Sequence, residues 1–324
     1  MMRTSTWQDA LRRTFARRGR ADRPGASEAA DVGPLLDEDA LRQLNQLSLV
    51  SGNAITDWLL GEHSGRRKTQ ALEFEDYRGY VPGDDYRLID WNAYARLGEL
   101  FVKTSQTEES ITLSLLLDCS RSMDWGHPNK LRYSKRLVAL LGALALLQSD
   151  EVRLYALGDG AARPGAPLSG AGALQVLVDE LEAMPVAATT DLRASLTAVR
   201  EPADLRGVLV LVSDLLVPAD QEDALGMLSA EGISASVLHI VDPAEALPDL
   251  DGALDLRDSE SGAQLPITLT PALRRRYRER FEARAQAVAA FCASQDIHYI
   301  RVSTDVPPAD LLAGAFLDEG VVQA

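Results

Sequence analysis

The chain has 324 residues, of which 46% are hydrophobic and 25% charged, and its formal net charge is -15. This composition is typical of a globular protein with enough apolar residues for one large domain or two smaller ones. The acidic balance argues against a nucleic-acid-binding protein, which normally has a basic surface. Cys119 and Cys292 form neither a disulfide framework nor a zinc motif. No apolar run is long enough to cross a bilayer and no apolar leader opens the chain, so we expect a cytoplasmic protein without a transmembrane segment.

Residues 1–34 form an arginine-rich region, with seven arginines up to Arg23 against two aspartates. Trp7, Leu11 and Phe15 recur every four residues, which is typical of a short basic amphipathic helix. We expect this region to be a flexible basic tail. The alternative is a segment that contacts a membrane surface or an acidic partner.

Residues 35–110 form a second segment before the first long apolar run. Leucines at helical spacing predict a helix from about Glu38 to Val50. Residues 82–85 read Pro-Gly-Asp-Asp and predict a turn, because proline fixes φ and glycine permits a positive φ. We expect ion pairs around this turn and not a catalytic carboxylate cluster, since spacing alone assigns no general acid or base. The side chains concerned are Asp84, Asp85 and Asp90 with Arg78, Arg87 and Arg96.

Residues 111–324 alternate between apolar runs of strand length and stretches with helical periodicity. Strands are expected at 111–117, 152–157, 208–212, 236–241 and 297–302, and helices at 131–147, 173–184, 192–200, 221–230, 271–294 and 307–317. A Gly/Pro-rich loop is expected at 158–172 and a short β excursion at 253–269. Repeated βα units predict an α/β fold with a parallel sheet and right-handed crossovers. Neither a G-x-G-x-x-G nor a P-loop motif appears, so no motif indicates nucleotide binding.

Three oxygen-bearing side chains follow the first apolar run, in the pattern D-x-S-x-S. Asp118, Ser120 and Ser122 alternate with Cys119 and Arg121, so they can point to one place while the other two face away. They come at the carboxyl end of a buried strand, where α/β folds bind ligands. Such oxygen ligands suit Mg²⁺, Mn²⁺ or Ca²⁺. The alternative is a set of ordinary turn and helix-capping residues.

The D-x-S-x-S loop resembles the metal-ion-dependent adhesion site of von Willebrand factor A-type domains. The resemblance implies a doubly wound, mainly parallel sheet with helices on both faces. In that family a threonine before a helix and an aspartate after a later strand complete the site. Thr190, with Thr189 as the alternative, and Asp214 stand at these positions. The resemblance therefore implies a divalent ion, Mg²⁺ or else Mn²⁺ or Ca²⁺, with an open position for an Asp or Glu of a protein partner. Its ligands would be Asp118, Ser120, Ser122, Thr190 and Asp214.

A denser pattern precedes this strand: residues 73–91 read E-F-x-x-Y-R-x-Y-x-P-G-D-D-x-R-x-I-D-W. With Ala95-Arg96 and the later D-x-S-x-S-M strand, the pattern resembles the bacterial domain of unknown function 58. That family accompanies MoxR-type AAA+ ATPases and has a von Willebrand A-like carboxyl half. The resemblance implies three parts: the tail 1–34, a family-specific segment 35–110 and a von Willebrand A-like domain 111–324. It also implies a non-enzymatic adaptor or co-chaperone that helps such an ATPase to remodel or mature a client complex.

Two other functions stay open at this point. A metal-dependent hydrolase, such as a phosphoesterase, would use the ion as a Lewis acid, but the sequence offers no assignable base and no G-x-S-x-G motif. A scaffold with a degenerate metal site would keep its activity in an Asp118→Ala variant. We expect His239 to lie in the core. The arginines of 271–294 are expected on a solvated helix face, or alternatively on a surface for phosphate or a partner.

Overall fold

The computed structural model divides into two compact units, residues Met1–Gly61 with Ile111–Ala324 and residues Glu62–Ser110. It describes residues 33–37, 40, 42, 44, 77–79, 94, 101–103, 111–189, 191–200, 207–216, 221–229, 233–248, 250, 252–257 and 264–318. In the second unit β1 (Tyr77–Gly79) and β2 (Phe101–Lys103) pair antiparallel. The ion pairs predicted for Asp84, Asp85 and Asp90 lie outside the described residues, as does most of the tail 1–34.

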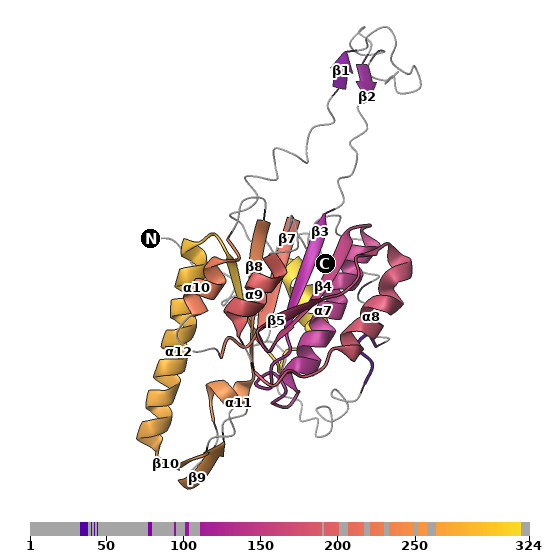
Figure 1. Cartoon of the computed structure of the whole chain (residues 1–324). Coiled ribbons are helices and arrows are strands. Elements are labelled where there is room, and N and C mark those ends of the chain that lie inside the picture. The colour runs from indigo at the N-terminus through magenta and orange to yellow at the C-terminus, as the bar shows by residue number, and fades with distance from the viewer. Residues whose placement is uncertain are drawn as a thin grey trace. The chain divides into compact units, whose positions relative to one another are not determined.

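A seven-stranded sheet forms the centre of the first unit (Figure 1). Its strands are β3 (Thr112–Asp118), β4 (Glu151–Gly158), β5 (Ala161–Pro164), β6 (Leu168–Ser169), β7 (Gly207–Ser213), β8 (Ile233–Val241) and β11 (His298–Ser303). They lie in the order β11-β8-β7-β3-β4-β5, with β6 also paired to β4. The five long strands are parallel, and β5 and β6 run antiparallel to β4. A separate antiparallel hairpin consists of β9 (Gly252–Arg257) and β10 (Gln264–Leu269).

Helices cover both faces of the sheet. They are α7 (Lys130–Leu147), α8 (Leu174–Ala183), α9 (Leu192–Arg200), α10 (Gln221–Gly226), α11 (Pro243–Ala246), α12 (Pro271–Ser294) and α13 (Pro308–Asp318), with a 3₁₀ turn at Ala171–Ala173. Because side chains alternate along a strand, Leu115 and Leu117 of β3 pack with α7, and Leu116 packs on the opposite face with α9. The predicted α/β class, with a mainly parallel, doubly wound sheet and helices on both faces, is confirmed.

The order of the strands reverses direction between β3 and β7. From β3 the chain builds outward to β4 and β5, and then returns to add β7, β8 and β11 on the other side. In doubly wound sheets, ligands bind outside the carboxyl ends of the strands at this point. The fold therefore places the end of β3 and the end of β7 side by side at the position where doubly wound sheets bind ligands.

The stretch 158–172, predicted as a loop, holds β5 and β6 instead. Asp159 and Gly160 have φ values of 52° and 68°, as in the two-residue turn that joins antiparallel strands. The Asp-Gly pair was the sequence signal for this turn, but the surrounding Gly and Pro residues indicated a loop over the whole stretch. The helix α10 ends at Gly226, before the predicted residue 230, because glycine is a poor helix former.

The described part of residues 33–44 belongs to the first unit. Ala40 and Leu44 are helical, within the helix predicted over 38–50, and both contribute to the core that contains α7. Leu35 is buried in the same core, and Asp37 forms an ion pair with Arg136 of α7. Among the described residues, no helix combines the length and the apolar character that crossing a bilayer requires.

Candidate functional site

Two aspartates lie next to each other at the carboxyl edge of the sheet. Asp118 ends β3, and Asp214 directly follows β7, which pairs with β3 in parallel so that Leu117 lies opposite Val212. Asp118 is 1% exposed and Asp214 is 2% exposed. The hydroxyl of Ser213 donates a hydrogen bond to Asp118 Oδ2 at 2.7 Å. The two strands thus bring together residues that are 96 positions apart in the sequence.

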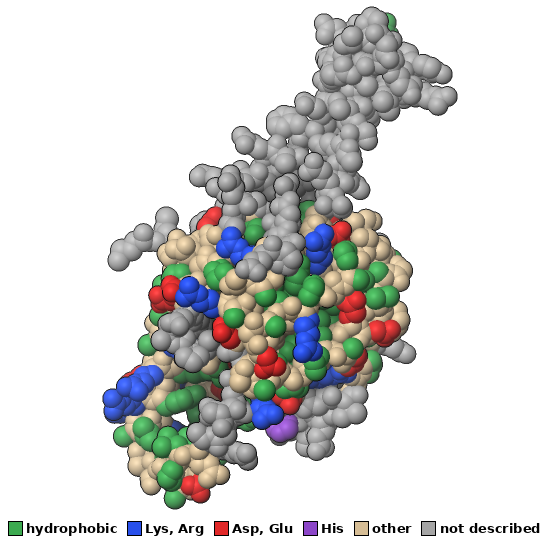
Figure 2. All heavy atoms as spheres, in the orientation of Figure 1, with side chains coloured by type: hydrophobic (Ala, Val, Ile, Leu, Met, Phe, Trp, Pro, Cys, Tyr) green, Lys and Arg blue, Asp and Glu red, His purple; other side chains and the backbone are tan. Residues whose placement is uncertain are grey.

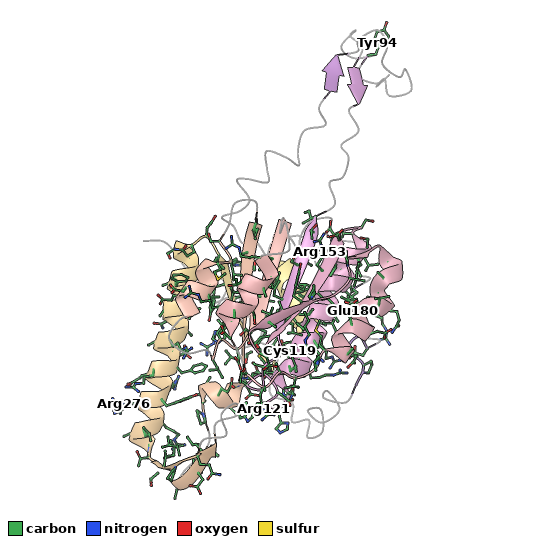
Figure 3. All side chains as sticks on the ribbon, in the orientation of Figure 1. Tyr94, Cys119, Arg121, Arg153, Glu180 and Arg276 are labelled. Atoms are coloured by element: carbon green, nitrogen blue, oxygen red, sulfur yellow. The ribbon has the colours of Figure 1, made fainter. Side chains whose placement is uncertain are left out.

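The D-x-S-x-S loop folds back on the end of β3. The backbone N–H of Ser120 donates to Asp118 Oδ1 at 2.9 Å, and Ser120 Oγ lies 3.0 Å from Ser122 Oγ. Of the two residues between these oxygen-bearing side chains, Cys119 is buried in the core and Arg121 is exposed; both are labelled in Figure 3. Burial, together with the negative charge of Asp118, raises the pKa of the Cys119 thiol to about 12, so the thiol stays protonated.

The loop after β7 fixes the second aspartate. The N–H of Leu216 donates to Asp214 Oδ1 at 3.1 Å, and the N–H of Leu215 donates to Ser213 Oγ at 3.0 Å. Leu215 has a φ of 53°, in the left-handed region that non-glycine residues rarely adopt. This tight turn holds the Asp214 carboxylate at the edge of the sheet.

The predicted threonine ligand, Thr190, lies outside the described residues. The alternative, Thr189, donates its hydroxyl to Asp159 Oδ1 at 3.3 Å, in the turn after β4. Asp191 caps α9 by accepting a hydrogen bond from the N–H of Ala194 at 2.9 Å. The structure therefore brings Asp118, Ser120, Ser122 and Asp214 to one edge.

A buried lysine that we did not predict joins this edge. Lys130, the first residue of α7, is 0% exposed, and its Nζ lies 2.7 Å from Asp214 Oδ2. The same ammonium forms an ion pair with Glu245 of α11 and lies 5.9 Å from the ring centroid of Trp125. A cation in the first turn opposes the helix dipole, and α7 has no acidic residue there. The sequence signal that could have revealed this contact is a lysine at the start of a helix. The helix dipole disfavours a positive charge there, so a carboxylate from another element is expected to neutralise it.

The site carries more negative than positive charge. Asp214 and Glu245 share one ammonium, and Asp118 has no cationic side chain among the hydrogen-bond and ion-pair partners that the structure describes. Burial raises the pKa of Asp118 to about 6, and the negative charge of Asp214 adds to the shift. Burial also raises the pKa of Glu245, against the opposing effect of Lys130. A bound cation would relieve this excess charge.

The oxygen atoms of three predicted ligands, Asp118, Ser120 and Ser122, suit a hard divalent cation. Neighbouring ligands of an octahedral Mg²⁺ lie about 2.9 Å apart when each bond is about 2.0–2.1 Å, and the two serine hydroxyls are 3.0 Å apart. Asp118 keeps unshared electron pairs on both oxygens in addition to its hydrogen bonds. Asp214 differs, because one of its oxygens already bonds to Lys130. Among the described residues no cluster of three or more His, Cys, Asp or Glu suits a metal, so an ion here would depend on the serine hydroxyls.

Comparisons with known proteins identify the family. The sequence model of the family DUF58, described as a protein of unknown function, matches residues 76–288. Uncharacterized proteins of Mycobacterium tuberculosis and Mycobacterium bovis are each 29% identical over 248 residues, 75% of this chain and 78% of the relative. Similar solved structures include BatB from Bacteroides thetaiotaomicron, with a TM-score of 0.41, 18% identity and coverage of 66% of this chain and 100% of that one. The SpRpn10 VWA domain has a TM-score of 0.37 and 12% identity, over 63% of this chain and 94% of that one. Because the family match spans more than half of the sequence, the chain belongs to the DUF58 family.

Proposed function

We propose that the protein is a non-enzymatic protein-binding module that recognises an aspartate or glutamate of a partner protein at the carboxyl edge of its sheet. The observation that carries the proposal is the buried Asp118 beside two converging hydroxyls, at the point where the strand order reverses. A divalent ion, Mg²⁺ or else Mn²⁺ or Ca²⁺, would supply the positive charge that receives the partner's carboxylate. Asp118, Ser120 and Ser122 would hold it, with Thr190 and Asp214 completing the site.

The chain's own residues keep these ligands in place before any partner arrives. Ser213 and the N–H of Ser120 each bond one oxygen of Asp118, which fixes the plane of the carboxylate. Lys130 holds Asp214, so the second aspartate would act on the ion through water or after it exchanges its ammonium partner. Because these side chains are already held in place, less conformational entropy is lost when a partner binds.

The ion pair between Lys130 and Asp214 favours a second candidate function. Lys130 already neutralises part of the negative charge at this edge, so the edge can be stable without a metal, and the protein would then be a scaffold that binds its partner without a metal. In that case an Asp118→Ala variant that folds would bind its partner as well as the wild type does. The two candidates therefore differ in a measurable way.

We extend the proposal to an adaptor or co-chaperone of a MoxR-type AAA+ ATPase that remodels or matures a client complex. Membership of the DUF58 family supports this partner, because the family is associated with such ATPases; the support comes from the family and not from a contact in the structure. Co-purification with the MoxR-type ATPase of the same organism, with and without Mg²⁺, tests it. We expect capture by the wild type and loss of capture in Asp118→Ala.

Calorimetric titration with MgCl₂ and MnCl₂ tests the metal directly. We expect the wild type to release or absorb heat with a single site, and Asp118→Ala to show none. Asp124→Ala is the matched control, because Asp124 is an exposed aspartate of the same loop whose carboxylate accepts only from Asn129 among the hydrogen bonds described for it. Equal binding by the wild type and a folded Asp118→Ala variant would refute the metal site. Absence of binding in the wild type, with and without the ATPase, would favour the scaffold.

A further inference from the structure

The long helix α12 extends past the carboxyl edge of the sheet. Its 24 residues span about 36 Å, whereas the six residues of β11, the strand that follows it, span about 20 Å. Its buried residues, Ala285, Val288 and Cys292, all lie in its carboxyl-terminal half. The amino-terminal end of α12 and the β9–β10 hairpin that precedes it lie beyond the strands, at the lower end of the first unit in Figure 1. We call β9, β10 and residues 271–284 the arm.

One face of the hairpin in the arm is entirely aliphatic. In the antiparallel register Leu256 lies opposite Leu265, and Leu254 lies opposite Ile267. Because these residues are two apart on each strand, their side chains share one face of the hairpin. Leu256 is 42% exposed and Leu265 is 59% exposed, and Figure 2 shows hydrophobic side chains gathered at this end of the molecule. A two-stranded hairpin is marginally stable in water, so an aliphatic face of this kind gains from a covering partner.

The helical part of the arm combines exposed apolar residues with a strong positive charge. Leu273 and Tyr277, one turn apart, are 40% and 41% exposed. Residues 271–284 include six arginines and two glutamates, in a chain whose net charge is -15. Arg276 projects from the outer side of α12, away from the sheet (Figure 3). The arm is therefore a basic and apolar surface on an otherwise acidic protein.

Contacts within the first unit connect the arm to the candidate site. Arg284 Nη2 donates to the carbonyl oxygen of Leu215, in the turn that holds Asp214, at 2.9 Å. The helix α11 packs against α12, and the negative charge of Glu245 adds to the effect of burial in raising the pKa of Tyr277. Glu245 is the residue that pairs with Lys130 beside the site. A partner seated on the site would thus meet the arm as well.

We propose that the arm binds an acidic, amphipathic segment of the protein partner, with glutamates or aspartates on the arginines and aliphatic side chains on the hairpin face. The inference rests on the proposed function, because it assigns both contacts to one partner. Charge complementarity selects this occupant. The chain's own tail carries seven arginines up to residue 23 and would be repelled by the arm. A membrane with anionic lipids would attract the arm but repel the rest of a chain with a net charge of -15.

Fluorescence anisotropy with synthetic peptides tests the arm separately from the metal. The probes are two fluorescein-labelled peptides of Glu and Leu, about 18 residues long, one with helical spacing of the leucines and one with strict alternation. Peptides with Lys in place of Glu are the matched controls. We expect one Glu peptide to bind the full-length protein, and the Lys peptides to bind at least about tenfold more weakly. Raising the salt concentration from about 0.05 to 0.3 M should weaken the binding several-fold.

Two pairs of substitutions locate the binding on the arm. Arg276→Glu with Arg278→Glu, and separately Leu256→Ser with Leu265→Ser, should each weaken the binding about tenfold or more. The double variant Arg163→Glu with Arg193→Glu changes the net charge equally at exposed positions outside the arm and should bind normally. In EDTA, which keeps any divalent ion from the candidate site, the Glu peptide should bind the wild type as tightly as it does in MgCl₂, so that failure of the metal site and failure of the arm give different results.

Four results would overturn the proposal. The first is equal binding of the Glu and Lys peptides, or no binding of either. The second is unchanged binding by both arm variants. The third is a dimer of the wild type, seen by light scattering, that Leu256→Ser with Leu265→Ser dissociates, because a second copy would then be the occupant. Binding to vesicles with phosphatidylserine in preference to the Glu peptide would likewise assign the arm to a membrane.

Discussion

Replacing Lys130 by methionine tests the internal charge balance of the site. The substitution keeps most of the side-chain volume and removes the ammonium that pairs with Asp214 and Glu245. At 2.7 Å and an effective dielectric constant of about 20, the attraction to Asp214 alone is about 6 kcal/mol. The cost of burying the charges offsets part of this attraction, and breaking a buried pair typically costs about 3–5 kcal/mol. We expect a loss of that size in Lys130→Met.

Thermal and urea unfolding measure this loss. For a domain of this size each kcal/mol corresponds to about 2–4 °C, so the midpoint should fall by roughly 6–20 °C. Lys135→Met is the matched control, because Lys135 is a lysine of the same helix, 7% exposed, whose Nζ donates to the carbonyl oxygen of Met184. A single hydrogen bond from a charged group contributes about 1.5–3 kcal/mol, less than the loss expected for Lys130→Met. Equal losses in the two variants, or a loss below about 1 kcal/mol in Lys130→Met, would refute the reasoning.

A double substitution separates the ion pair from the packing of the lysine chain. If the cost of Lys130→Met comes from the unpaired carboxylate, adding Asp214→Asn should recover part of the stability, with a coupling of about 1–3 kcal/mol. Lys130→Met should also gain more stability from Mg²⁺ than the wild type does, because removing the positive charge that pairs with Asp214 favours a cation at the site. Unfolding with and without MgCl₂ measures both effects. Additive losses would assign the effect to packing.

Two further predictions concern a buried histidine and a tight loop. Burial, helped by the positive charge of Arg301, lowers the pKa of His239 to about 4. The unfolded chain then binds the proton more tightly, so stability should fall by about 3 kcal/mol between about pH 6.5 and 4. The stability of His239→Gln, measured by urea unfolding over this pH range, should not show this loss. Gly126 has a φ of 97°, and an added Cβ would lie 2.4 Å from Asp242 Oδ2. Gly126→Ala should therefore cost at least about 1 kcal/mol more than Gly170→Ala, where φ is 73° and no atom lies within 4 Å of the added Cβ; equal midpoints would contradict this.

The periodicity of the sequence determined most of the α/β elements. The apolar run before Asp118 and the helical spacing over 271–294 predicted β3 and α12, because a strand buried on both faces and a helix leave different patterns. The same local reasoning predicted His239 in the core, and the structure places it there, bonded to the hydroxyl of Tyr299. The D-x-S-x-S loop was predicted from its alternating oxygen-bearing side chains at a strand end and Asp214 from a resemblance, and the parallel pairing of β3 with β7 brings them to one edge.

The tertiary structure alone decided the charge partners of the site and the exposure of the arm. Lys130 meets Asp214 across 84 positions and Glu245 across 115, distances at which no local pattern specifies a partner. The sequence of α12 shows its arginines and apolar residues, but the short length of β11 decides that its first half extends past the sheet. Local patterns determine which residues form strands and helices because these depend on neighbours in the chain. Burial and ion pairing depend on which elements pack together, and that is settled only when the whole domain folds.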